Sequence, residues 1–148
     1  MTQVPILQIP FDGADREFLH DGLEEILGSG FLTLGKWTRQ FEEMLAAFTG
    51  ARHCISMNSG TAALEVILRA LGVEGGSVIV PTDTFLATAL AAIHAGNRVI
   101  FADSDPKTLS LDVADVERRI AADTQAVILV HIGGIVSPAW EELKALCD

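Results

Sequence analysis

The chain has 148 residues and a formal net charge of −10. This charge argues against binding to nucleic acid or to an anionic membrane surface, because both partners need clustered lysine and arginine. Hydrophobic residues make up 49% of the chain, a surplus that suits a sheet covered by helices on both faces. The apolar runs are too short to span a membrane, and the amino terminus has no signal sequence, so we expect a cytoplasmic protein.

The first fifty residues predict two amphipathic helices. Apolar side chains recur at helical spacing over residues 15–27, and the sequence Gly28-Ser29-Gly30 is typical of a helix end. A second apolar face runs over residues 36–48 and is closed by Gly50. We therefore expect a helical segment over residues 1–50.

The remainder, residues 51–148, alternates short strands with helices. We expect strands at 52–57, 77–80, 98–102 and 126–131, and helices at 60–71, 84–94, 113–121 and 138–146. Ser137 is the expected N-cap of the last helix, with Pro138 at its first position. This alternation predicts an α/β fold with a largely parallel sheet and flanking helices. Because the sequence stops within a strand–helix repeat, we expect the domain to be incomplete.

The clearest candidate binding motif is Asn58-Ser59-Gly60-Thr61, which follows an expected strand and opens an expected helix. Hydroxyls, a glycine and the unpaired N–H groups of a first helical turn can bind phosphate without any lysine. The same residues are explained equally well by ordinary N-capping through Asn58 or Ser59. Both interpretations stay open on these residues alone.

Three further residues follow expected strands. Phe85 falls in the first turn of the expected helix 84–94, where its ring could face a ligand at the carboxyl edge of the sheet or pack on the core. Asp103 is interpreted as a turn residue before Pro106. His131 ends the last expected strand, where a structural, hydrogen-bonded role is favoured over that of a base.

Several kinds of chemistry have no motif in this sequence. There is no GxGxxG, Walker A or metal-ligand pattern, and Cys54 and Cys147 are far apart, with Cys54 expected to be buried. The sequence contains three lysines, Lys36, Lys107 and Lys144, and none lies in a setting that indicates a Schiff base.

Taken in order, these segments resemble the DegT/StrS-like aminotransferases, which use pyridoxal 5'-phosphate (PLP) to aminate keto-sugars attached to nucleotides. The resemblance rests on motifs spread over nearly the whole chain. They are Phe31-Leu32-Thr33-Leu34-Gly35, Phe41-Glu42, Thr49-Gly50, Asn58-Ser59-Gly60-Thr61-Ala62-Ala63-Leu64, Val78-Ile79-Val80-Pro81, Thr84-Phe85-Leu86-Ala87-Thr88, Ile100-Phe101-Ala102-Asp103 and Val130-His131-Ile132-Gly133-Gly134.

The resemblance implies a set of roles. Ser59, Gly60 and Thr61 would hold the cofactor phosphate, and Phe85 would stack on the pyridine ring. The chain would be part of the large domain of the aspartate-aminotransferase-like fold (PLP fold type I). The substrates of the complete enzyme would be a nucleotide-sugar and an amino acid such as glutamate, and the enzyme would be a homo-oligomer with no nucleic-acid or membrane partner.

The chain also departs from the family. Family members are more than twice as long, and the aspartate at the pyridine nitrogen, the Schiff-base lysine and the small carboxyl-terminal domain lie beyond the equivalent of Asp148. Gly134-Ile135-Val136-Ser137 differs from the family's residues after the histidine. We therefore expect 1–148 to be an incomplete PLP-binding large domain, inactive by itself. The alternatives are a non-catalytic binding or assembly module that pairs with another chain, and a fragment of another fold-type-I PLP enzyme.

Overall fold

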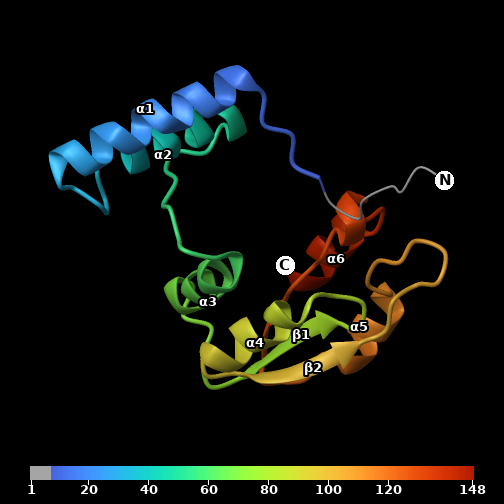
Figure 1. Ribbon diagram of the computed structural model, residues 1–148. Helices are drawn as coiled ribbons and strands as arrows, with labels where there is room; N and C mark the ends of the chain where they lie inside the picture. Colours follow the sequence, from blue (N-terminus) through green and yellow to red (C-terminus); the bar gives the residue numbers. More distant parts are fainter. Residues whose placement is uncertain (1–7) are drawn as a thin grey trace, which may run out of the picture. The chain divides into compact units, whose positions relative to one another are not determined.

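The computed structural model describes residues 8–148 and divides into two compact units (Figure 1). Unit 1 ends at Ser56 and contains the helices α1 (Gly13–Ser29) and α2 (Lys36–Thr49). Unit 2 is Met57–Asp148. Its elements in chain order are α3 (Gly60–Ala70), β1 (Ser77–Pro81), α4 (Leu86–His94), β2 (Arg98–Ala102), α5 (Val113–Arg119), β3 (Thr124–Val127), the 3-10 turn η1 (Ile132–Gly134) and α6 (Trp140–Cys147). None of the helices among these residues is long and apolar enough to cross a membrane.

Local capping sets the bounds of the two helices of unit 1. Asp12 and Asp15 form a reciprocal capping box at the start of α1, which satisfies N–H groups that the helix itself leaves unpaired. Gly30 (φ 70°) and Gly50 (φ 73°) adopt left-handed backbone conformations after α1 and α2, as helix-ending glycines commonly do. The two predicted helices are therefore confirmed, and α1 extends slightly beyond its expected bounds.

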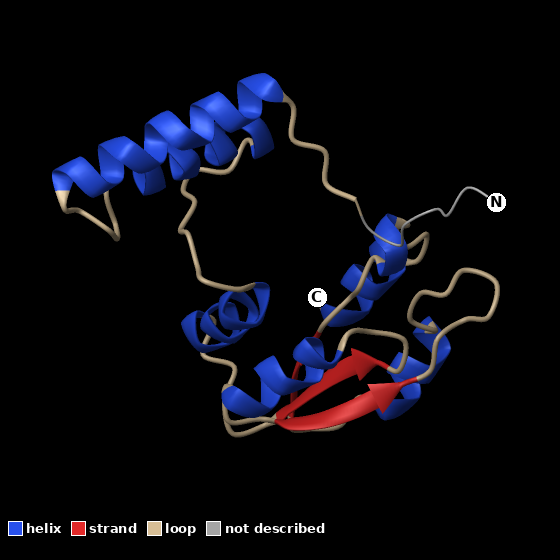
Figure 2. Cartoon of the chain, in the orientation of Figure 1, coloured by secondary structure: helices blue, strands red, loops and turns tan. Residues whose placement is uncertain are grey.

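The sheet of unit 2 is parallel, with strand order β2-β1-β3. Strand β1 pairs with β2 from Ser77↔Arg98 to Pro81↔Ala102. Its other edge pairs with β3, and Ile79 is opposite Val127. Parallel neighbours require long crossovers, and helices supply them here (Figure 2). The predicted α/β class with a parallel sheet and flanking helices is confirmed.

Helices cover both faces of β1. Val78 and Val80 point to one face, where they pack with side chains from α3 and α4. Ile79 points to the other face and packs with side chains from α5 and α6. All three side chains are fully buried, as expected for a parallel strand enclosed on both sides.

The strand predicted at 52–57 is wrong. This segment lies at the end of unit 1 and forms no ladder within the described residues. The Ser56 N–H donates instead to a carboxylate oxygen of Glu42, at 2.7 Å. An extended sequence pattern indicates a strand only when a neighbouring strand supplies hydrogen bonds, and here a side chain takes that role.

Three further boundaries differ from the prediction. The ladder of β3 ends at Val127, although the next N–H, from Ile128, still donates to Ile79 (2.9 Å). Helix α4 begins at Leu86, with Phe85 as its N-cap rather than inside its first turn. Helix α6 begins at Trp140, not at Pro138.

The late start of α6 has a local cause. The Ser137 N–H donates to Nδ1 of His131 (3.1 Å), and the Ser137 hydroxyl accepts from the Ala139 N–H (3.3 Å). These two bonds favour a turn over Pro138, because a hydrogen bond from a nearby backbone N–H to a serine hydroxyl competes with helix formation. Ser137 therefore caps a turn, and Ala139 takes the N-cap position.

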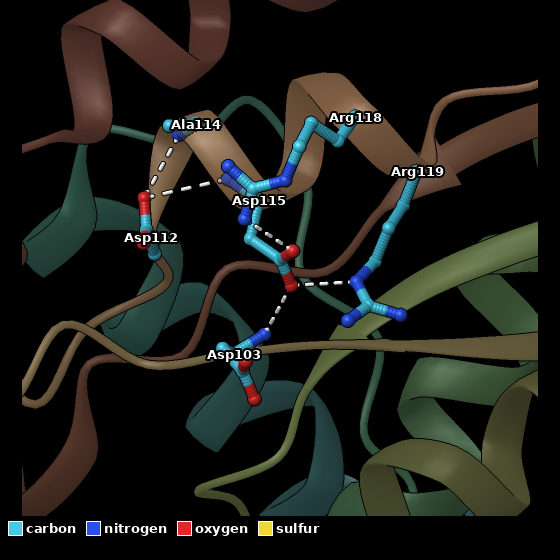
Figure 3. A network of polar contacts seen from close by, with 6 residues as sticks. All are labelled: Asp103, Asp112, Ala114, Asp115, Arg118 and Arg119. Atoms are coloured by element: carbon cyan, nitrogen blue, oxygen red, sulfur yellow. Dashed lines mark hydrogen bonds and ion pairs between the residues drawn. The ribbon is translucent and has the colours of Figure 1, made fainter.

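The connection from β2 to α5 is held by a buried carboxylate (Figure 3). Asp115 is only 4% exposed and accepts hydrogen bonds from Arg118 (2.7 Å), from Arg119 (2.5 Å) and from the backbone N–H of Asp103 (2.7 Å). Three hydrogen bonds hold the pKa of Asp115 at about 2, below its usual value of 3.8. In order of effect, they come from Arg119, from the Asp103 N–H and from Arg118.

The side chain that makes the turn in this connection is Asp105, not Asp103 as predicted. Oδ1 of Asp105 accepts from the N–H groups of Lys107 (2.6 Å) and Thr108 (3.2 Å). Asp103 contributes its backbone instead, through its N–H to Asp115 and its carbonyl, which accepts from the Asp112 N–H (2.9 Å).

Cys54 also differs from expectation, being half-buried rather than buried, and both cysteines are free.

Replacing Gly76 with alanine is expected to destabilise unit 2. An added Cβ would lie 2.5 Å from the carbonyl oxygen of Asp123 and 2.7 Å from Cδ of Gln125. Backbone atoms in a sheet cannot move far, so we expect a loss of about 1–3 kcal/mol in the free energy of unfolding, measured by urea titration. Gly60→Ala is the matched control, because a Cβ there meets nothing within 4 Å. Equal effects of the two substitutions would contradict this expectation.

The low pKa of Asp115 predicts a specific acid sensitivity. Its stabilising effect is complete above the unfolded-state pKa of 3.8 and is lost as the pH falls through the folded-state value of about 2. Urea unfolding from pH 5 to pH 2 should therefore show a falling midpoint for the unmodified chain and a flatter profile for Asp115→Asn. Glu117→Gln, an exposed position on the same helix, should keep the steep profile. A flat profile for the unmodified chain would refute the assignment.

Candidate functional site

The start of α4 lies at the carboxyl edge of the sheet. Strands β1 and β2 are parallel, so the connection between them must carry the chain back from the carboxyl end of β1 to the amino end of β2. Helix α4 makes this return and therefore runs antiparallel to the strands. Its N-cap, Phe85, follows the carboxyl end of β1 by four residues and lies at this edge.

The start of α3 lies at the same edge. Near the carboxyl end of α3, Arg69 donates to the carbonyl oxygen of His94, and a carboxylate oxygen of Glu65 lies 3.8 Å from Nδ1 of His94. Because His94 is the last residue of α4, the carboxyl ends of the two helices lie together and the helices run in the same direction. At about 1.5 Å per residue, their first residues fall at nearly the same level. The predicted phosphate motif and Phe85 are thus on one side of unit 2.

The turn before α3 presents free donors. Ser59 is the N-cap, its Oγ accepting from the Ala62 N–H (3.2 Å) and its carbonyl from the Ala63 N–H (3.1 Å). The N–H groups of Gly60 and Thr61, at the first two helical positions, have no acceptor within the part of the chain that the structure describes. The ordinary N-cap interpretation is therefore confirmed for Ser59, and it leaves two donors available at the positive end of the helix dipole.

Space around this turn also suits a ligand. A Cβ added at Gly60 would meet no atom within 4 Å, so the backbone is open on that side. Hydroxyl and N–H donors at a helix start, beside an open glycine, match the donor set that a phosphate group requires. The residues present therefore fit the phosphate group of PLP.

Phe85 is held by its backbone while its ring is left free. Phe85 is 80% exposed. The alternative prediction, that this side chain packs on the core, is therefore wrong within unit 2. The carbonyl of Phe85 accepts from the Thr88 N–H (3.0 Å), and the hydroxyls of Thr84 and Thr88 lie 2.7 Å apart. This threonine pair was not predicted from the sequence, although its i, i+4 spacing across a helix start was an available signal.

Strands β1 and β3 leave the sheet toward opposite faces. The chain leaves β1 for α4, which covers the face of Val78, and it leaves β3 toward α6, which covers the face of Ile79. In open α/β sheets, ligands bind where adjacent strands diverge in this way, at their carboxyl ends. His131 follows β3 on this side, but its Nδ1 accepts from the Ser137 N–H (3.1 Å), as its expected structural role requires.

A separate cavity lies in unit 1. It has a volume of about 270 Å³ and lies beside the loop between α1 and α2. Trp37 and Lys36 line it, and Nζ of Lys36 is paired with Glu25 at 2.6 Å. None of the predicted site residues contributes to this cavity.

Comparison with known proteins agrees with this geometry. Residues 14–148 match the model of the DegT/DnrJ/EryC1/StrS aminotransferase family. The spore coat polysaccharide biosynthesis protein SpsC of Bacillus subtilis is 44% identical over 74% of this chain and 28% of its own length. The GDP-perosamine synthase of Vibrio cholerae is 34% identical over 98% of this chain and 39% of its own length.

Solved structures give the same result. One is NtdA from Bacillus subtilis, solved with the bound cofactor PMP (pyridoxamine 5'-phosphate). It superposes with a TM-score of 0.85 at 29% identity, and the match covers 99% of this chain and 35% of that one. The PLP form of the putative sugar aminotransferase Spr1654 from Streptococcus pneumoniae gives 0.80 at 32% identity, over 93% of this chain and 36% of that one. The chain spans about a third of the length of these relatives. It belongs to the DegT/DnrJ/EryC1/StrS aminotransferase family, and the solved structures that it resembles include a PLP-bound and a PMP-bound protein.

Proposed function

We propose that unit 2 binds the phosphate group of PLP at the start of α3 and the pyridine ring at Phe85. The observation that carries this proposal is the placement of two helix starts, one with free N–H donors and one with an exposed aromatic ring, at the same edge of the sheet. The N–H groups of Gly60 and Thr61 donate to phosphate oxygens. The Ser59 hydroxyl adds a third donor, since its oxygen already accepts from Ala62 and its proton is free.

The ring of Phe85 supplies the second contact. An aromatic ring with 80% of its surface exposed contributes little to folding and offers a flat face for stacking, which stabilises aromatic pairs by about 0.5–1.5 kcal/mol. When bound, PLP supplies the carbonyl chemistry through which an amino group is exchanged between substrates. The residues of this chain hold the phosphate and orient the ring for that chemistry.

The complete protein, in this proposal, transfers an amino group from an amino acid such as glutamate to a keto-sugar linked to a nucleotide. Support comes from the name of one relative, a dTDP-4-dehydro-2,3,6-trideoxy-D-glucose 4-aminotransferase of Saccharopolyspora spinosa, which is 38% identical over 86% of this chain. The GDP-perosamine synthase of V. cholerae is a second relative named for a nucleotide-linked product. The protein would act as a homo-oligomer.

The chain by itself is proposed to bind the cofactor without turning over substrate. A Schiff-base lysine must reach the cofactor and must lose its proton readily, which usually requires burial. Lys107 and Lys144 are exposed, and Lys36 lies in unit 1 in an ion pair with Glu25. None of the three is a buried residue.

A second candidate is a non-catalytic assembly module that pairs with another chain. Exposed apolar side chains favour it, such as Leu71 (72% exposed) in unit 2 and Phe48 (88% exposed) in unit 1. Such a module would associate with its partner without responding to phosphate or PMP. Ligand titration therefore distinguishes the two candidates, whereas oligomeric state alone does not.

Two substitutions should separate the phosphate contact from the ring contact. Ser59→Gly removes the hydroxyl while costing the helix cap only a few tenths of a kcal/mol, so the affinities for PMP and inorganic phosphate should both fall by roughly tenfold. Phe85→Ala should weaken PMP alone, by about threefold to tenfold. NMR titration of the Gly60 and Thr61 amides would measure both affinities. Phe48→Ala is the control, and an equal loss with it would refute the ring assignment.

Borohydride reduction after incubation with PLP should give no specific adduct. We expect Lys36, Lys107 and Lys144 to be labelled weakly and to similar extents, as measured by peptide mass spectrometry, because none lies in a desolvating environment. Excess PMP, which carries no aldehyde, should not reduce this labelling. Labelling concentrated at one lysine and prevented by PMP would contradict the proposed inactivity of the chain alone.

A further inference from the structure

One peptide group links α5 to the turn that carries Phe85. The N–H of the Ala102–Asp103 peptide, at the end of β2, donates to Oδ2 of Asp115 (2.7 Å). The carbonyl of this same peptide accepts from the N–H of Thr82 (2.9 Å). A single peptide group therefore has the buried carboxylate on one side and the first residue after β1 on the other.

The carboxylate is fixed and charged. Asp115 is 4% exposed, and Arg118 and Arg119 each donate to one of its oxygens, at 2.7 and 2.5 Å (Figure 3). These contacts keep the pKa of Asp115 well below its ordinary range. Its Oδ2 is therefore a strong acceptor with a defined position, and a hydrogen bond to an ionised acceptor is about twice as strong as one between neutral groups.

Hydrogen bonds in a chain polarise one another. When a peptide N–H donates to a carboxylate, electron density shifts toward the carbonyl oxygen of the same peptide and makes it a better acceptor. Here that carbonyl belongs to Ala102, and its partner is the Thr82 N–H. The charge of Asp115 thus strengthens the bond that fixes the beginning of the segment 82–85.

The segment 82–85 is otherwise held only at its far end. Thr84 and Thr88 pair through their hydroxyls (2.7 Å), and the Phe85 carbonyl accepts from the Thr88 N–H (3.0 Å), which joins that end to α4. Asp83, between the two fixed ends, is exposed and makes no hydrogen bond among the residues that the structure describes. The direction in which Phe85 leaves the sheet edge therefore depends on the Thr82 bond.

We propose that Asp115 is a positioning residue for Phe85, acting through the Ala102–Asp103 peptide group and the Thr82 N–H. Its importance for ligand binding rests on the proposed stacking role of Phe85. The link itself does not, because it is made of hydrogen bonds that are independent of any ligand.

Amide hydrogen exchange on the 148-residue chain tests the link. In Asp115→Ala, exchange of the Thr82 N–H should be at least tenfold faster relative to the amides of β1, which report opening of the whole sheet. The matched control is Asp112→Ala, which removes the N-cap of the same helix, where Asp112 accepts from the Ala114 N–H (2.9 Å), but leaves the carboxylate of Asp115 in place. Equal protection of Thr82 in the two variants would overturn the proposal.

A milder variant covers the case in which Asp115→Ala does not fold. Asp115→Asn keeps the shape of the side chain and one acceptor oxygen but removes the charge. We expect a smaller increase in Thr82 exchange, about threefold, together with a shift of the Asp103 and Thr82 amide resonances in the same direction. An unchanged Thr82 resonance and exchange rate in this variant would also overturn the proposal.

Ligand titration separates this inference from the proposed function. If both proposals hold, Asp115→Ala lowers the affinity for PMP by about threefold and leaves the affinity for inorganic phosphate unchanged, because phosphate does not contact Phe85. A general loss of structure, as in Asp112→Ala, would lower the affinities for both ligands together or for neither. If the unmodified chain binds no PMP, the proposed function fails, while Thr82 exchange still decides whether Asp115 controls this turn.

Discussion

Strand β1 has no side that faces solvent, and the position of the candidate site follows from this constraint. Burial on both faces requires helices on both sides of the sheet, and parallel pairing on both edges requires crossovers. The crossover helix α4 returns antiparallel to the strands, so its first turn and Phe85 lie at the carboxyl edge. Helix α3 precedes β1 and packs beside α4 on the same face, so its first N–H groups lie at that edge as well, before any ligand is considered.

An acidic chain that binds a phosphate group must do so without a basic cluster. With a net charge of −10, the long-range field disfavours anions, and all four arginines of unit 2 are neutralised locally. Those with carboxylate partners at 3.0 Å or less are Arg69, Arg98, Arg118 and Arg119. Backbone donors are not subject to such pairing, and their attraction acts within about one helical turn. The start of α3, with its two N–H donors and the Ser59 hydroxyl, meets this requirement.

Sequence reasoning succeeded where one short-range signal determined the outcome. Apolar periodicity and the helix-ending glycines predicted α1 and α2, and the buried run Val78-Ile79-Val80 predicted β1. It failed where side-chain hydrogen bonds determined the backbone. In the 52–57 segment the Ser56 N–H donates to Glu42 and not to a neighbouring strand, and α6 starts late because Ser137 bonds to His131 and Ala139. The link from Asp115 to Thr82 could not be predicted, since it needs the register that sets Pro81 beside Ala102.

The residues proposed to bind the cofactor are those whose interactions the fold does not complete. Ser59 caps α3 with its hydroxyl oxygen, and among residues 8–148 its hydroxyl proton and the N–H groups of Gly60 and Thr61 have no acceptor. Phe85 begins a helix with its backbone and leaves its ring exposed, at a position where a smaller polar cap would serve the helix better. Folding alone gives no reason for a phenylalanine at this helix start, because a polar N-cap would stabilise α4 better. A phosphorylated aromatic ligand would satisfy all of these groups at once, which is the physical reason for placing the site here.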